Sequence, residues 1–141
     1  MKMIALTLAA SLMVPVAFAQ EDTFEQVFNQ QRALYGKGHA FTYAGQPYTT
    51  DHPEEIEAMA EPTRANAEAL ITSAEAMRQE SESLGYEWRD PARFLKQART
   101  ALSENEYQRA MDLAARAKYQ ARMSIAQYES VNASWQQAVP E

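Results

Sequence analysis

The fold of this chain is decided by residues 84–123, which read LGYEWRDPARFLKQARTALSENEYQRAMDLAARAKYQARM. Apolar side chains recur there every three or four positions in two runs, the spacing that gathers them on one face of an α-helix. Asp90 and Pro91 form a helix start, with the aspartate as the cap and the proline in the first turn. A short polar break centred on Asn105 separates the two runs. The stretch therefore predicts two helices joined by a tight connection.

The inward positions of both helices are rich in alanine. The second helix is expected to run from Tyr107 to about Gln137, and its small interior side chains allow neighbouring helices to approach closely. The inward face of the first helix is expected to hold Phe94, Leu95, Ala98, Ala101 and Leu102, and that of the second Tyr107, Ala110, Met111, Ala114, Ala117, Ala121, Ile125 and Tyr128.

A third helix is predicted upstream, from about Pro62 to Leu84, and Gly85 ends it where a left-handed residue is wanted. Abundant Ala, Glu, Gln and Arg with few Val and Ile favour helix over strand. The sequence therefore predicts an all-α fold, an antiparallel three-helix bundle over residues 62–137. The inward face of the third helix is expected to hold Ala67, Leu70, Ala74, Met77, Ser81 and Leu84.

Residues 20–61 are predicted to form an irregular N-terminal arm ahead of the bundle. A short helix over 23–35 begins at Asp22 or Thr23. Residues 36–50, GKGHAFTYAGQPYTT, indicate an ordered loop or a weak hairpin whose aromatic side chains are pinned against the helices. Asp51 is expected to cap a short helix near 53–60, with Glu54 closing a capping box.

Residues 1–19, MKMIALTLAASLMVPVAFA, are typical of a cleavable secretory signal. Lys2 supplies the positive start, and residues 17–19 supply the small-x-small pattern, so cleavage is expected between Ala19 and Gln20. The apolar run is shorter than the roughly 20 residues that span a bilayer. The mature protein is therefore predicted to be periplasmic and soluble, with no membrane span and no lipid anchor.

Composition narrows the chemistry that the chain can perform. It has no cysteine, which excludes disulfides, thiol catalysis and the CxxCH attachment of c-type haem. Asp51, His52, Glu54 and Glu55 lack the ligand spacing of zinc enzymes, and no serine lies in a nucleophile elbow. A net charge of −6 disfavours nucleic-acid binding. No metal, cofactor or catalytic residue is predicted.

Charge is unevenly divided along the chain. Residues 20–87 carry 13 acidic and 4 basic side chains, whereas residues 88–122 carry 4 acidic and 8 basic ones. Either the two halves neutralise each other within the fold, or the basic half is offered to an acidic partner. The first interpretation is favoured, because charge runs usually form solvated helix faces.

The connection at residues 84–90 also has two interpretations. Tyr86 and Trp88 plug the open end of an alanine-rich bundle, with Arg89 paired to Glu87 or to a helix C-terminus and Asp90 as the cap. Alternatively, Trp88 and Arg89 anchor a partner, since these residue types dominate interface hot spots. The plug is the favoured interpretation.

At these residues the chain resembles the SoxXA-binding protein family, small periplasmic proteins of sulfur-oxidising bacteria. The similarity spans about residues 66–128. It rests on the Leu84–Asp90 connection, on the pattern of Tyr107, Ala110, Leu113, Ala114 and Ala117, and on the basic stretch from Arg116 to Arg122. The resemblance implies a helical, non-enzymatic accessory protein that associates with the c-type cytochrome SoxXA of thiosulfate oxidation.

The leading expectation is thus a periplasmic accessory protein that binds a protein partner. The alternative is a structural envelope protein that self-associates through its long last helix, and a small-ligand pocket lined by Phe41, Tyr43 and Tyr48 ranks third. The candidate contact residues are Trp88, Arg89, Arg93, Lys96, Arg116, Lys118 and Arg122.

Overall fold

The computed structural model of the chain describes residues 22–138. The predicted signal peptide, residues 1–19 with its cleavage site at Ala19 and Gln20, lies outside the described residues. The prediction of a mainly helical protein is confirmed, and a small two-stranded sheet accompanies the helices. The elements in chain order are α1 (Phe24–Tyr35), β1 (Ala40–Tyr43), β2 (Gln46–Thr49), α2 (Pro53–Glu57), α3 (Arg64–Ser83), α4 (Arg89–Ser103) and α5 (Tyr107–Ala138).

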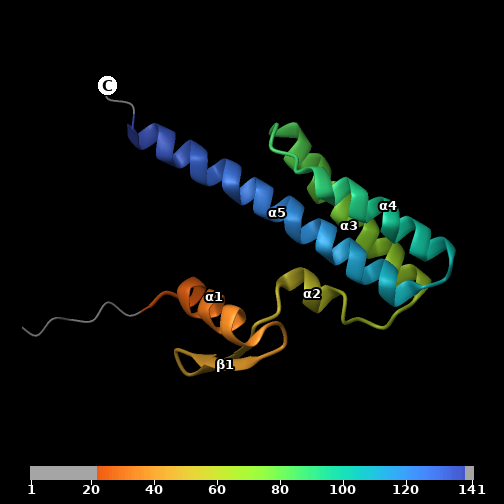
Figure 1. Ribbon diagram of the computed structural model, residues 1–141, viewed down its shortest axis with the longest axis horizontal. Coiled ribbons are helices and arrows are strands. Elements are labelled where there is room, and N and C mark those ends of the chain that lie inside the picture. Colours follow the sequence, from red (N-terminus) through yellow and green to blue (C-terminus); the bar gives the residue numbers. More distant parts are fainter. Residues whose placement is uncertain (1–21, 139–141) are drawn as a thin grey trace, which may run out of the picture.

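Helices α3, α4 and α5 lie side by side and form what we call the helical body (Figure 1). The guanidinium of Arg64, the first residue of α3, lies 5.8 Å from the ring centroid of Tyr107, the first residue of α5. At the other end of α3, the Ser81 hydroxyl is hydrogen-bonded to that of Ser124. Helices α3 and α5 therefore run in the same direction and pack directly on each other, and α4 runs in the opposite direction.

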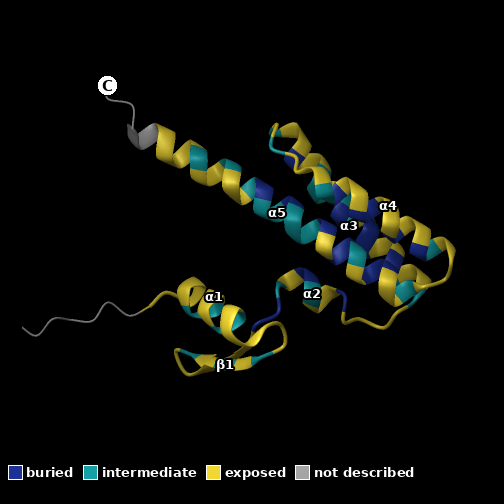
Figure 2. Ribbon diagram, viewed as in Figure 1, coloured by how far each residue is buried: buried dark blue, intermediate teal, exposed yellow. Residues whose placement is uncertain are grey.

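The interior of the helical body is built mainly from alanine, and it lies where the three helices meet (Figure 2). Among the described residues, ten of the fifteen buried hydrophobic ones are alanines, all but Ala58 in these three helices, and the five larger ones are Leu70, Ile71, Phe94, Leu95 and Met111. The predicted inward positions of α4 are buried, apart from the partly buried Leu102. In α3, Met77 and Leu84 are only half-buried, and the buried Ile71 was not anticipated.

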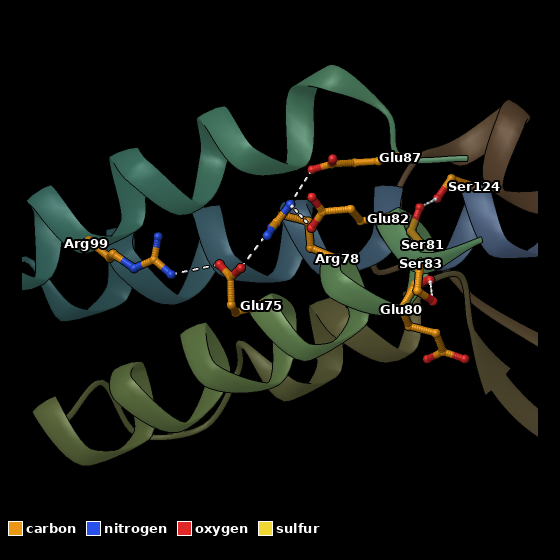
Figure 3. Close-up of polar contacts among 9 residues, drawn as sticks. All are labelled: Glu75, Arg78, Glu80, Ser81, Glu82, Ser83, Glu87, Arg99 and Ser124. Carbon is orange, nitrogen blue, oxygen red and sulfur yellow. Dashed lines mark hydrogen bonds and ion pairs between the residues drawn. The ribbon is translucent and has the colours of Figure 1, made fainter. Parts of the chain in front are cut away.

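An ion-pair chain joins α3, α4 and the connection between them (Figure 3). Arg78 Nε donates to Glu75 Oε1 at 2.8 Å, and the Arg78 guanidinium also binds Glu87. Arg99 Nη2 of α4 reaches the second Glu75 oxygen at 2.8 Å. Of the two partners expected for Arg89, Glu87 instead binds Arg78 of the preceding helix, whereas pairing with a helix C-terminus stays a prediction.

The prediction of an irregular N-terminal arm is wrong. Of the two structures predicted for residues 36–50, an ordered loop or a weak hairpin, the structure has the hairpin. Strands β1 and β2 pair antiparallel, with Phe41 opposite Tyr48. Ala44 and Gly45 both have positive φ, 48° and 77°, as a two-residue hairpin turn with the right-handed twist requires. Helix α1 begins at a capping box in which Thr23 and Gln26 exchange hydrogen bonds. The arm is thus a helix packed on a hairpin.

Two helices begin at different residues from those predicted. Helix α2 has His52 as its N-cap, because the Glu55 carboxylate accepts the His52 backbone N–H at 2.8 Å. Asp51 and Glu54 therefore do not form the expected capping pair. Helix α4 begins at Arg89, with Trp88 as the N-cap, so Asp90 lies in its first turn rather than at the cap.

Candidate functional site

In the connection between α3 and α4, Tyr86 packs against the helical body whereas Trp88 is partly exposed. Gly85, with φ of 72°, ends α3 in the left-handed conformation. Tyr86 packs edge-on against Tyr128 of α5, with ring centroids 5.2 Å apart. Trp88 is 39% exposed, and its indole N–H donates to Gln127 Oε1 at 3.2 Å. The plug interpretation thus fits Tyr86, whereas the Trp88 indole remains open to solvent.

Helix α4 presents a basic face beside this tryptophan. It carries four basic side chains and one acidic side chain between residues 89 and 103. Arg89, Arg93 and Lys96 follow one another at spacings of four and three, which places them on one face of the helix. Within the part of the chain that the structure describes, neither Arg89 nor Lys96 lies within ion-pair distance of a carboxylate.

Two guanidinium groups sit on one buried aromatic ring at the edge of this face. The ring centroid of Phe94 lies 4.7 Å from Arg93 Cζ and 4.5 Å from Arg116 Cζ. Arg93 also makes an exposed ion pair with Asp90 at 3.0 Å. The ring holds the two cations near one another by cation–π attraction and so concentrates positive charge at the surface.

A shallow groove of about 340 Å³ continues the basic face toward the start of α5. Its walls carry three cationic side chains and one carboxylate, so its field is positive. The groove is lined by Arg93, Lys96, Gln97, Thr100, Ala101, Glu104 and Arg109.

Lys118 and Arg122, the last two candidate contact residues, do not join this face. Arg122 Nε and Nη2 bind the two carboxylate oxygens of Glu54 at 2.6 and 3.1 Å. Lys118 Nζ binds Glu57 at 2.7 Å. These two basic side chains of α5 therefore hold α2 against the helical body, as the neutralisation interpretation predicts for the two pairs.

The environment of Glu54 explains the strength of this attachment. Its side chain is only 2% exposed. Burial acts to raise the pKa of Glu54, but the hydrogen bonds from Arg122 and from the backbone outweigh it and leave the pKa below its ordinary value. The carboxylate is therefore ionised and paired.

The arm is also held by aromatic and ionic contacts around His52. The imidazole stacks on Tyr119 of α5, with centroids 4.4 Å apart and planes 29° apart. Burial and the charge of Arg32 lower the pKa of His52, so the ring is neutral at pH 7. Arg32 of α1 binds both oxygens of Glu55, at 2.6 and 2.9 Å, and the backbone carbonyl of Thr50.

A second and larger hollow, about 700 Å³, lies where the arm meets α5. Sequence reasoning missed it, because its walls come from segments that lie far apart in the chain and show no motif. Its polar lining is Asn29, Arg32, Lys37, His52, Glu55, Asp112, Arg116, Tyr119 and Gln120, with Ala58 and Ala115 as the apolar part.

The arm aromatics pack on one another. The ring of Phe24 has its centroid 6.1 Å from Phe41, 5.4 Å from Tyr43 and 4.8 Å from Tyr48. These contacts engage the three side chains that were considered as a pocket lining. The cluster is partly exposed, and it packs α1 against the hairpin.

Residues 22–138 contain no group of three or more potential ligands placed to hold a metal ion. In the same range, no helix combines the length and the apolarity that crossing a membrane requires. Comparison with protein-family models, with curated proteins and with solved structures finds no match for this chain.

Proposed function

We propose that this protein is a non-enzymatic accessory protein of the cell envelope that binds an acidic partner through the basic face of α4. In this proposal α3, α4 and α5 act as an antiparallel three-helix bundle that presents the face as a rigid surface. The observation that carries the proposal is the row of Arg89, Arg93 and Lys96, two of which have no ion-pair partner among residues 22–138. Unneutralised cations on a rigid helix steer and orient an acidic surface.

The resemblance to SoxXA-binding proteins makes a c-type cytochrome complex of thiosulfate oxidation the first partner to test. Trp88 lies at the start of the same helix and is exposed, so it supplies the apolar anchor that a purely ionic contact lacks. A thiosulfate-oxidation gene cluster beside the coding sequence would support this assignment.

The test is affinity capture of the tagged mature protein from a periplasmic extract at low salt, with haem absorbance and mass spectrometry as the readouts. We expect a haem protein to be retained by the wild type and lost from the double variant Arg93→Glu/Lys96→Glu. The matched control is Arg64→Glu. The side chains of Arg64 and Arg93 are similarly exposed, at 52% and 56%, and each makes an ion pair within its own helix. Retention of no protein by the wild type would overturn the proposal.

A second candidate, self-association, is favoured by the far end of α5. This end continues past the connection between α3 and α4 (Figure 1). Trp135 is 64% exposed there, and Tyr128 and Val131 lie on the same side of the helix at spacings of seven and four residues. Residues 123–138 carry one charged side chain, Glu129, so a second copy meets little repulsion. Sedimentation velocity over a broad range of concentration tests this candidate, and a constant monomeric coefficient would reject it.

A further inference from the structure

The hollow between the N-terminal arm and α5 has the size and the walls of a small-molecule site. Its volume of about 700 Å³ lies within the range of roughly 300–1,000 Å³ that is usual for ligand pockets. Three separate elements form it, since Arg32 comes from α1, Glu55 from α2 and Arg116 from α5. Some of the polar side chains that line the hollow make no ion pair or hydrogen bond elsewhere in the fold.

The charges on the walls do not cancel. Arg32 and Glu55 neutralise each other through a two-point ion pair. Lys37 and Arg116 have no carboxylate within ion-pair distance among residues 22–138. Asp112 is the other acidic group of the lining, and it accepts one hydrogen bond from Gln108. The Arg116 guanidinium also lies against the Phe94 ring of α4, a contact that leaves its charge unneutralised. Two cations and one carboxylate of the lining therefore have no counter-ion among residues 22–138.

The α5 wall also carries an acceptor with no donor. The Oε1 atom of Gln120 is buried and has no hydrogen-bond partner. An unsatisfied buried acceptor is costly, because the atom has lost its hydrogen bonds to water without gaining a donor. Asp112, Arg116 and Gln120 follow at intervals of four residues, so the carboxylate, the guanidinium and the amide share one face of the helix.

The remaining side of the hollow is aromatic and uncharged. It is formed by the stacked pair of His52 and Tyr119. Burial and the nearby Arg32 lower the pKa of His52, so the imidazole adds no charge at pH 7. The lining therefore offers two cations, one carboxylate, one unsatisfied acceptor and a flat wall.

From this arrangement we propose that the hollow binds a small zwitterion of the amino-acid class. The ligand carboxylate lies between Lys37 and Arg116, where two cations can donate to its oxygens. The ligand ammonium donates to Asp112, and to Gln120 Oε1 once the Gln120 side chain has turned toward the hollow. A ligand side chain lies along the His52–Tyr119 wall. The site is separate from the basic groove of α4, and its occupancy would tie the arm to the helical body.

The test is isothermal titration of the full mature chain with L-glutamine and L-phenylalanine, two zwitterions that differ in side chain. Propionate and propylamine are the half-ligands, since each carries only one of the two charged groups. We expect saturable binding of at least one amino acid, with binding of both half-ligands weaker by at least about tenfold.

Lys37→Gln and Arg116→Gln are each expected to weaken amino-acid binding by about tenfold. Lys96→Gln is the matched control, because it removes an unpaired surface cation outside the hollow, and it should leave binding unchanged. Circular dichroism establishes that each variant is folded, and Lys37 is an exposed loop residue whose replacement disturbs no packing. Gln120→Leu should also reduce affinity.

Three results would overturn the proposal: no saturable binding of either amino acid, binding of propionate as tight as that of the amino acids, or unchanged affinity in both Lys37→Gln and Arg116→Gln. Chemical-shift changes in labelled protein give an independent readout. They should centre on residues 112–120 and on the segment that follows α1. In α4 they should be confined to the surroundings of Phe94, whose ring contacts Arg116.

Discussion

At the scale of single residues, the ion pair of Glu54 and Arg122 holds the arm against the helical body. Replacing Arg122 by Met keeps the apolar stem and removes the charge, which leaves the Glu54 carboxylate buried without its partner. The expected loss of stability is about 3 kcal/mol. Denaturant unfolding followed by circular dichroism measures it.

Lys118→Met is the matched control on the same helix. Its partner Glu57 is 44% exposed, so water can replace the lost ion pair. The expected loss is below about 1 kcal/mol. Equal losses in the two variants would show that burial of Glu54 does not determine the strength of the attachment.

Glu55 makes the stability depend on pH. The hydrogen bonds from Arg32, which outweigh the opposing effect of burial, lower the pKa of Glu55 to about 2. A free glutamate titrates near pH 4.3, so the unfolded chain takes up this proton first as the pH falls. The ionised Glu55 therefore stabilises the fold fully above about pH 4.5, and this stabilisation is lost as the pH falls from about 4.5 to about 2.

The measurement is the free energy of unfolding of the wild type and of Glu55→Gln across this interval. The wild type should be more stable at pH 7, and the difference should shrink toward zero near pH 2. Glu68→Gln serves as the control, because its ion pair with Arg64 is exposed. A difference that stayed constant with pH would contradict the assigned role of the Arg32–Glu55 pair.

At the scale of the elements, a substitution in the connection before α4 distinguishes a packing role of Trp88 from a partner-binding role. Trp88 is partly exposed and makes one hydrogen bond, so Trp88→Ala should cost about 1–2 kcal/mol rather than the 3–5 kcal/mol or so of a fully buried tryptophan. Under the proposed function it should also weaken partner capture strongly. A loss of more than about 3 kcal/mol would restore the plug interpretation.

Helix positions were predictable because periodicity and caps are local. Short stretches of sequence predict the helix after Thr23, the left-handed Gly85 and the alanine face of α5. They also predict the tight connection at Asn105, although not its positive φ of 60°. The capping box of α2 was misplaced by one residue for a non-local reason. Glu54 binds Arg122 of α5, which leaves Glu55 to hold the His52 N–H.

The candidate sites were predictable only in part, for the same reason. Arg89, Arg93 and Lys96 share a face by spacing alone, so their grouping could be read from the sequence. The sequence does not show that Lys118 and Arg122 are occupied by glutamates, because those partners lie before α3. The hollow at Lys37 and Arg116 likewise depends on how the arm docks.

At the scale of the whole molecule, protection against hydrogen exchange should fall in three steps. The middle of the helical body is buried on several sides and should exchange slowest. The arm is joined to it mainly by ion pairs, by one aromatic stack and by the buried Ala58, so it should exchange faster than the body, and faster still in high salt. Residues 129–135 of α5, nearly all exposed, should exchange fastest.

Mass spectrometry of deuterated peptides gives the order directly. Sodium chloride should accelerate exchange in the arm without changing the middle of α3. Uniform protection across all three regions would mean that the arm and the end of α5 unfold together with the body, contrary to this expectation.

The alanine interior has a thermodynamic consequence. A methyl group exposes little apolar surface when the chain unfolds, and ten of the fifteen buried hydrophobic residues are alanines. The heat capacity of unfolding should therefore lie below the usual 12–15 cal/mol/K or so per residue. A small heat capacity change flattens the dependence of stability on temperature, so calorimetry should record a small baseline step across the transition and stability should fall little in the cold.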